Sequence, residues 1–202
     1  MTAVTESWAR IDAWLREHAP ATFAKLAPPA DQAEIARVQD EMELKFPQDL
    51  VDSLLCHDGM ADYSDIYVLP EHYPLLSVAQ ILEHWHDNGV INGQHDDQAS
   101  ETQWFHPRWI PIASIEGDSQ IIDTRDGRLG EHFSDQGGYF GPGTWTSLRA
   151  YLSATAEALL NGTDVKGRYP HVDENGEVLW VELADTEGWG RTLNRLPAEV
   201  SA

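Results

Sequence analysis

Cysteine is nearly absent from this sequence: Cys56 is the single one among 202 residues. A lone cysteine forms no disulfide within its own chain, so the fold does not rest on such bridges. Cys56 lies between apolar neighbours without a flanking cation to stabilise a thiolate, and we interpret it as a small buried side chain. Neither a GxSxG motif nor a family-specific cysteine signature is present, so the sequence offers no nucleophile for covalent catalysis.

Long apolar runs are also missing, and none approaches the ~18 residues that a membrane span requires. The opening residues, MTAVTESWAR, lack the basic and apolar regions of a signal peptide. Together with the lone cysteine, these absences predict a soluble protein of the reducing cytoplasm.

Basic residues are scarce, with 13 lysines and arginines against 34 aspartates and glutamates, which gives a formal net charge of −21. So acidic a chain is repelled by phosphate groups, and we expect it to bind neither nucleic acid nor a membrane. The charge favours a basic protein partner, although an acidic surface also serves solubility.

No lysine or arginine occurs between Lys45 and Arg108, and we call residues 46–107 the acidic window. Its acidic residues are Asp49, Asp52, Asp58, Asp62, Asp65, Glu71, Glu83, Asp87, Asp96, Asp97 and Glu101. Unless the fold scatters them, they create a negative field that steers a basic partner. We take the members in expected loops as the candidate partner-binding residues: Asp62, Asp65, Asp96 and Asp97.

The acidic window also holds six of the nine histidines: His57, His72, His84, His86, His95 and His106. A zinc site needs ligands at short fixed spacings such as HExxH, whereas the rings of His84 and His86 on a helix would point about 200° apart. The other histidines are scattered singly. We therefore predict no metal site and no cofactor, and keep a small metal-dependent hydrolase built on this window as an alternative.

Two further features could carry chemistry. The glycine-rich stretch GGYFGPG matches no phosphate-binding motif, and no lysine follows it to meet a phosphate. Asp118 and Asp123 flank expected strands and could act as an acid–base pair. Hydrogen bonds at turns and strand ends are the commoner role of aspartates at such positions, and we expect that role here.

Apolar residues at steps of three and four predict helices over 6–18, from Asp31, from Pro47 to before Gly59, from Ser77, and from Trp145 to Asn161. Asp31 can cap its helix, while Ser77 and Gln80 form a capping box. The pattern further predicts a short edge strand within 62–69 and a long exposed loop over 88–100.

The stretch from Trp104 to Ser134 is expected to form the centre of a sheet. Its three strand-like runs, 109–115, 120–124 and 128–133, should be antiparallel neighbours, with the helix after Thr144 packed on one face. Asp126-Gly127 is a strong hairpin signal, and Asn175-Gly176 predicts a second hairpin. We interpret 137–143, with its four glycines in GGYFGPG, as a connection without a strand.

Several segments, in the same order, resemble the SUKH superfamily, which includes fungal regulators of cell-wall assembly and bacterial immunity proteins of polymorphic toxin systems. They run from Trp8 to Gly162: the opening helix with Trp8 and Trp14, LAPPADQAEIARVQDEMELKFPQDLVDSLLCHDG, PLLSVAQILEHW, WIPIASIEGDSQIIDTRDGRLGEHF, and the helix from Trp145. The resemblance implies a single α+β domain over 1–183, an antiparallel β-sheet wrapped by several α-helices. The apolar pattern fades from Ala184, and we expect 184–202 to be a loosely held tail.

The resemblance further implies a protein-binding role without catalysis. Combined with the acidity, it leads us to expect an immunity protein that sequesters a basic toxin domain, such as a nuclease, since nucleases must be basic to hold phosphates. The alternatives are an intracellular scaffold or regulator coordinating cell-wall assembly and the metal-dependent hydrolase.

Overall fold

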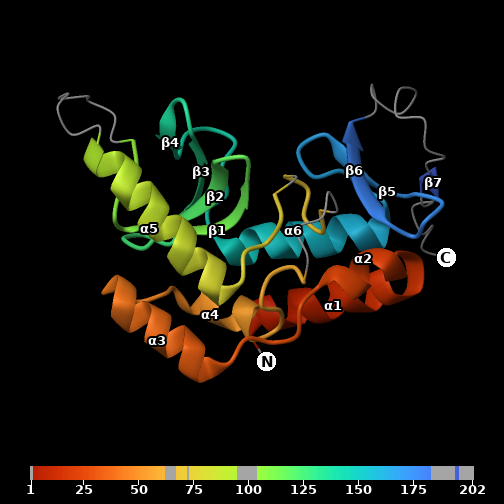
Figure 1. Ribbon diagram of the computed structural model, residues 1–202. Helices are drawn as coiled ribbons and strands as arrows, with labels where there is room; N and C mark the ends of the chain where they lie inside the picture. The colour runs from red at the N-terminus through yellow and green to blue at the C-terminus, as the bar shows by residue number, and fades with distance from the viewer. Residues whose placement is uncertain (1, 62–66, 72, 95–103, 183–193, 196–202) are drawn as a thin grey trace.

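The computed structural model describes residues 2–61, 67–71, 73–94, 104–182 and 194–195. The helices in this part of the chain are α1 (Ala3–His18), α2 (Pro20–Lys25), α3 (Gln32–Met42), α4 (Gln48–Leu54), α5 (Val78–Gln94) and α6 (Leu148–Asn161). Its strands are β1 (Trp109–Ile115), β2 (Asp118–Asp123), β3 (Leu129–Phe133), β4 (Gly137–Tyr139), β5 (Arg168–Val172), β6 (Val178–Glu182) and β7 (Asn194–Arg195). Figure 1 shows two β-sheets above a layer of helices, which confirms the α+β class.

The four-stranded sheet has the order β1-β2-β3-β4 and is antiparallel throughout. Ile110 pairs with Ile122, which pairs in turn with Leu129, so the three predicted runs are neighbours as expected. Gly127 has φ +78°, the left-handed conformation that favours glycine in this turn. The predicted centre of the sheet is therefore confirmed.

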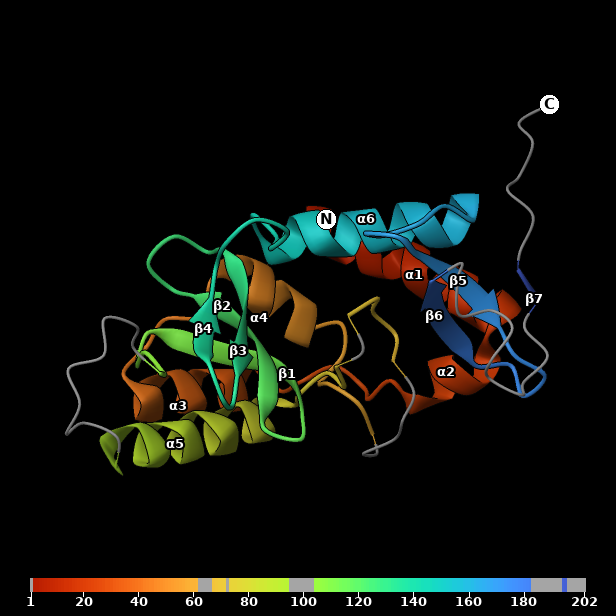
Figure 2. The same ribbon diagram turned by 90° about the horizontal axis from the view of Figure 1, so that it is seen from above.

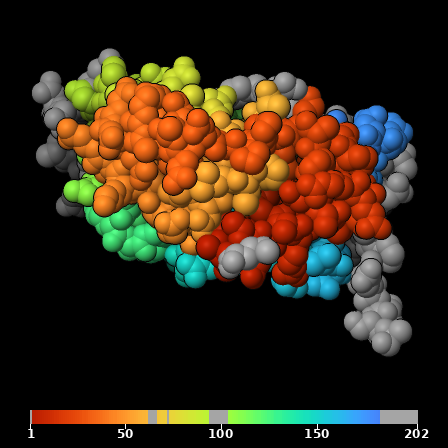
Figure 3. All heavy atoms as spheres, turned by 90° about the horizontal axis from the view of Figure 1, so that it is seen from below, coloured from red at the N-terminus to blue at the C-terminus, as the bar shows by residue number. Residues whose placement is uncertain are grey.

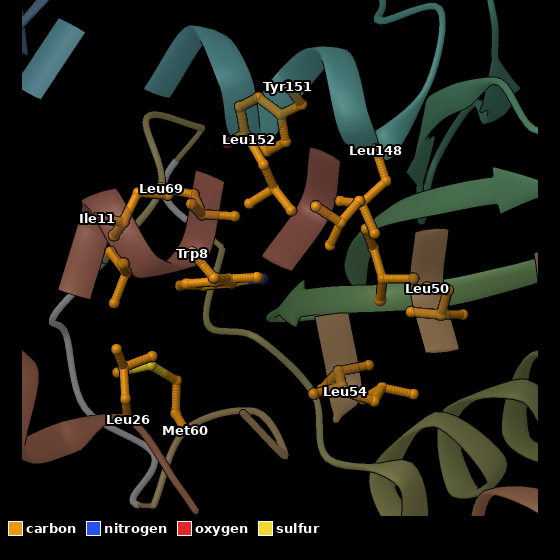
Figure 4. Close-up of a cluster of buried hydrophobic side chains, with 14 of the residues drawn as sticks. Trp8, Ile11, Leu26, Leu50, Leu54, Met60, Leu69, Leu148, Tyr151 and Leu152 are labelled. Carbon is orange, nitrogen blue, oxygen red and sulfur yellow. The ribbon is translucent and has the colours of Figure 1, made fainter. Parts of the chain in front are cut away.

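This sheet is buried on both faces. One face joins the main core, which gathers side chains from the helices, β1 and the segment before α5 (Figure 4). In that close-up Trp8, Leu54 and Leu152 point toward one another from three different helices. The opposite face carries a smaller aromatic cluster of Phe105 and Trp109 with Ile121, against which Trp85, Trp104 and Phe140 pack.

The helix after Thr144 packs on the sheet only in part, through side chains near its start. α6 lies chiefly beside α1, and Arg10 and Glu157 form an ion pair of 2.6 Å between the two helices (Figure 2). The chain touches the sheet just before α6 begins, where the carbonyl of Trp145 accepts a hydrogen bond from the Leu129 amide at 3.1 Å. The apolar stripe of α6 is thus covered chiefly by α1, while Leu148 and Leu152 near its start also lie against Ile112 of β1.

The predicted loop over 88–100 begins too early, because α5 continues to Gln94. Asn88 is 8% exposed, and the side chain of Asn92 accepts a hydrogen bond from the Phe105 amide at 3.2 Å. Tertiary contacts of this kind outweigh the poor helix propensity of Gly89 and Gly93. Residues 95–100 lie outside the described part of the chain.

The predicted connection over 137–143 is wrong in its first part, because residues 137–139 form strand β4, which pairs with β3. The two glycines gave no strand signal in the sequence. A Cβ on Gly138 would lie 2.2 Å from the Trp109 ring, so the strand needs glycine there to admit the indole. The predicted edge strand over 62–69 is absent from its described residues 67–69. Instead, the Leu75 region covers the edge of β1, with a hydrogen bond from the Leu76 amide to the Ile112 carbonyl at 2.9 Å.

The second predicted hairpin is confirmed: β5 and β6 pair on either side of the turn at Asn175-Gly176, where Gly176 has φ +77°. β7 adds to the free edge of β5 and was not predicted, and neither was the short α2. Of the expected tail 184–202, only Asn194 and Arg195 are described, so its looseness stays a prediction. None of the described helices is both long and apolar enough to cross a bilayer.

Candidate protein-binding surface

The four candidate partner-binding residues, Asp62, Asp65, Asp96 and Asp97, lie outside the described residues, as does Glu101. Their role stays a prediction. The other acidic residues of the acidic window show how the fold distributes its charge: Asp49, Asp52, Asp58, Glu71, Glu83 and Asp87.

Most of these carboxylates are used inside the molecule. Asp49 forms an ion pair of 3.0 Å with Arg149 of α6, a cation that lies far outside the acidic window in the sequence. Asp52 is buried and accepts a side-chain hydrogen bond within α4. Asp58 accepts a hydrogen bond of 2.7 Å from the Val78 amide, which begins α5. The fold therefore compensates the charge of Asp49 with a distant cation and uses Asp52 and Asp58 as hydrogen-bond acceptors.

Glu71 is the centre of a polar cluster that the sequence analysis missed. Its carboxylate is 8% exposed and accepts hydrogen bonds from the side chains of Gln120 on β2, Trp145 before α6 and Lys166 before β5. These partners lie 49, 74 and 95 residues away in the chain. No local sequence signal marks such a site, because every contact depends on the finished fold.

The titratable side chains around Glu71 have raised pKa values. Burial, with a contribution from Glu71, raises the pKa of Glu131, which faces the same pocket from β3. Burial also raises the pKa of Tyr151, whose hydroxyl accepts a hydrogen bond from the Glu71 amide at 3.2 Å. The pKa of Tyr73 is raised to about 12 by burial, with Glu131 adding to it. Because Glu71 already accepts three donors, this Glu71 cluster fixes the segment before α5 against both the sheet and α6.

Glu83 and Asp87 behave differently, since both are exposed on α5 and neither has a cation partner within the described residues. They are followed on α5 by Val90, 62% exposed, and Ile91, 39% exposed. Residues at i, i+4, i+7 and i+8 share one side of a helix, so acidic and apolar groups form a single outward face here. In Figure 3, α3 in orange lies beside the yellow-green surface of α5.

The histidines do not gather into a metal site in the described part of the chain, where no group of three or more possible ligands lies close enough to hold an ion. His57 contacts Asp12 Oδ1 through Nε2 at 2.9 Å and packs edge-on to the Trp8 ring. His106 Nδ1 accepts a hydrogen bond from the Arg108 amide at 2.9 Å. Two members of the set lie outside the described residues: His72 and His95.

The other candidate catalytic residues have structural roles, as predicted. Asp118 accepts a hydrogen bond of 2.8 Å from the Ser134 amide, and Asp123 accepts one of 2.9 Å from the Arg125 amide. Burial would raise the pKa of Asp123, but its hydrogen bonds from Arg125 outweigh burial and lower it. Burial, with nearby carboxylates, raises the pKa of Cys56 to about 11, so its thiol stays protonated at neutral pH.

Residues 29–162 match the model of the SMI1/KNR4 family (SUKH-1). The chain belongs to this family. The matched region runs from just before α3 to the end of α6, and so contains the four-stranded sheet, α5 with its outward face, and most of the Glu71 cluster. The family resemblance found in the sequence is confirmed.

Three fungal proteins are similar to the chain. The cell wall biosynthesis/cell cycle regulator smi1 of Schizosaccharomyces pombe is 27% identical in an alignment of 149 residues. This alignment covers 63% of this chain and 30% of that protein. A KNR4/SMI1 homolog of Yarrowia lipolytica is 31% identical over 84 residues, covering 42% and 12% of the two chains. The cell wall assembly regulator SMI1 of Saccharomyces cerevisiae is 36% identical over 56 residues, covering 28% and 11%. The matches therefore span less than a third of each fungal protein.

Proposed function

We propose that this chain is a non-enzymatic protein-binding module that acts as a scaffold or regulator in cell-wall assembly. The observation that carries the proposal is the family match over residues 29–162, together with three relatives whose names refer to SMI1 or KNR4. This reading ranks above the immunity protein favoured by the sequence alone, because two of the three relatives are named as cell wall regulators and the third as a homolog of KNR4/SMI1.

The chemistry of the described residues supports a binding role. Two side chains with shifted pKa values have structural surroundings: Asp123 closes a turn, and Glu131 lines the same pocket as Glu71. Cys56 keeps its proton at neutral pH. The formal net charge of −21, with exposed carboxylates such as Glu83 and Asp87, suits recognition of a basic protein partner.

A gene deletion in the organism of origin tests this proposal. Loss of the full chain should change survival on agents that perturb the cell wall, and re-expression of the full chain should restore it. Normal growth of the deletion strain on every wall-perturbing agent would contradict a role in wall assembly.

The immunity protein stays a second candidate, favoured by the formal net charge of −21. An acidic inhibitor competes with nucleic acid for the basic surface of a nuclease. Under this reading the deletion strain keeps normal wall resistance but dies when a toxin gene beside the immunity gene is expressed. Survival of that strain without the full chain would exclude this candidate.

A further inference from the structure

The second half of α5 is built unlike a helix that serves packing alone. Val90 is 62% exposed, the largest value among the exposed large hydrophobic side chains of the described residues, and its neighbour Ile91 is 39% exposed. Single exposed apolar residues are ordinary on protein surfaces. Here two of them adjoin Glu83 and Asp87, exposed carboxylates one to two turns away on the same face.

Gly89 and Gly93 lie on the side of α5 next to Val90 and away from Ile91, because each residue turns about 100° around the helix axis. A Cβ built on either glycine would meet no heavy atom within 4 Å, so no neighbour in the structure requires glycine there. Gly is among the least favourable residues in a helix interior. Gly93, three residues after Val90, leaves the backbone beside that side chain bare.

The charges set the kind of partner. On the adjoining helix α3, Glu41 already bonds Arg37 Nη1 at 2.7 Å, so its charge is partly compensated. Glu83 and Asp87 have no such partner among the described residues and remain available. Uncompensated carboxylates beside an apolar pair complement a segment that carries both lysine or arginine and an apolar side chain.

We infer that the outward face of α5, formed by Glu83, Asp87, Val90 and Ile91, is the docking surface for a basic amphipathic segment of a protein partner. The inference rests on the proposed protein-binding function and names the chemistry of its partner. The apolar side chain of the partner packs on Val90 and Ile91. Its cations lie over Glu83 and Asp87 at the rim, where charges act mainly on the association rate.

Two synthetic helical peptides test this surface on the full chain. One peptide has lysine on one side and leucine on the other, and its counterpart has serine in place of every leucine. Titration followed by NMR should shift the amides of Glu83, Asp87, Val90 and Ile91 with the lysine/leucine peptide, and the lysine/serine peptide should bind at least about tenfold more weakly.

Two double variants separate the apolar and the charged parts of the surface. Val90→Ser with Ile91→Ser should weaken the lysine/leucine peptide at least about tenfold, because the apolar contact is lost. Glu83→Lys with Asp87→Lys should slow association and remove most of its salt dependence. The control carries the same change of charge at exposed positions elsewhere, Asp135→Lys with Glu174→Lys, and should bind within about twofold of the parent chain.

Several results would overturn the inference: amide shifts spread over the acidic surface, equal binding of the two peptides, or parent-like affinity of the serine double variant. Thermal melting shows whether that variant is folded, and substitution of exposed residues should leave the melting temperature nearly unchanged. The outcome is distinguishable from failure of the proposed function. Peptide binding at α5 with normal wall resistance of the deletion strain would remove the wall role alone, whereas a wall phenotype with no peptide binding at α5 would remove this surface alone.

Discussion

α6 and the second half of α5 are both helical, but different forces keep them so. α6 buries Tyr151, Leu152 and Leu159, begins at the cap of Ser147 and ends at Gly162, which has φ +61°. The second half of α5 has two glycines and two exposed apolar residues, and it is tied down by buried Asn88 and by the bond to Asn92. The contrast separates a helix selected for packing from one whose outward face, in our account, is selected for a partner.

The largest expected effect is in the packed helix. Leu152→Ala removes a side chain that is 0% exposed, and should lower the free energy of unfolding by about 2–5 kcal/mol because a cavity remains. The matched control is Leu160→Ala on the same helix, where the side chain is 39% exposed and the loss should be below about 1 kcal/mol. Urea unfolding measures both. Equal losses would show that the packing of α6 is not what stabilises it.

The anchor at the start of α6 comes next. Glu71→Gln keeps the shape of the side chain but removes the charge that accepts from Trp145 and Lys166, so it should cost about 1.5–3 kcal/mol. Glu174→Gln, at an exposed position, should change stability by less than about 0.5 kcal/mol. A Glu71→Gln variant that melts with the parent chain would mean that the buried carboxylate is not holding the segments together.

The aromatic cluster near α5 should make stability depend on pH. His132 is 0% exposed and packs edge-on to Trp104 and Phe105. Burial lowers its pKa, while the Asp118 carboxylate and the backbone of Trp104 oppose the effect.

Because the unfolded chain binds a proton near pH 6.5 and the folded chain only at lower pH, stability from His132 is complete above about pH 6.5. It should fall below that value by at most about 1.4 kcal/mol per pH unit, until the lowered pKa is passed. Urea unfolding at pH 7.5 and 5.5 tests this against His132→Phe, which cannot be protonated. A variant that loses as much stability as the parent chain on acidification would assign the effect to other groups.

The smallest expected effect has the opposite sign and lies in the second half of α5. Gly89→Ala and Gly93→Ala meet no neighbouring atoms and should each stabilise the chain by about 0.4–1 kcal/mol, because alanine restricts the unfolded chain and favours the helix. Thermal and urea unfolding of the single and double variants measure the gain. Loss of stability would mean that glycine is needed there for packing after all.

The same contrast explains what the sequence could predict. Apolar periodicity located α6, and Asp126-Gly127 located the β2–β3 hairpin, because those signals are local. The extension of α5 through Gly89 and Gly93 depends on Asn88 and Asn92 contacting other segments, and β4 depends on Trp109 filling the space over Gly138. Such features become visible only once distant residues meet.

Of the candidate site, too, only the local features could be predicted. A scarcity of cations along the chain suggested a single acidic field, but Arg149 and Lys166 return from distant positions to compensate Asp49 and Glu71. Sequence order carries no information on such pairings. Glu83 belongs to the acidic window and is exposed, as the sequence suggested. Val90 and Ile91, which share its face of α5, lie within the stretch 88–100 that the sequence assigned to a loop.

The affinity of the lysine/leucine peptide for the Val90→Ser, Ile91→Ser double variant tests the central claim most directly. If these two side chains hold a partner, the double variant should melt close to the parent chain and yet bind the peptide at least about tenfold more weakly. Parent-like binding by the folded variant would contradict the account, and would leave the outward face of α5 as ordinary surface.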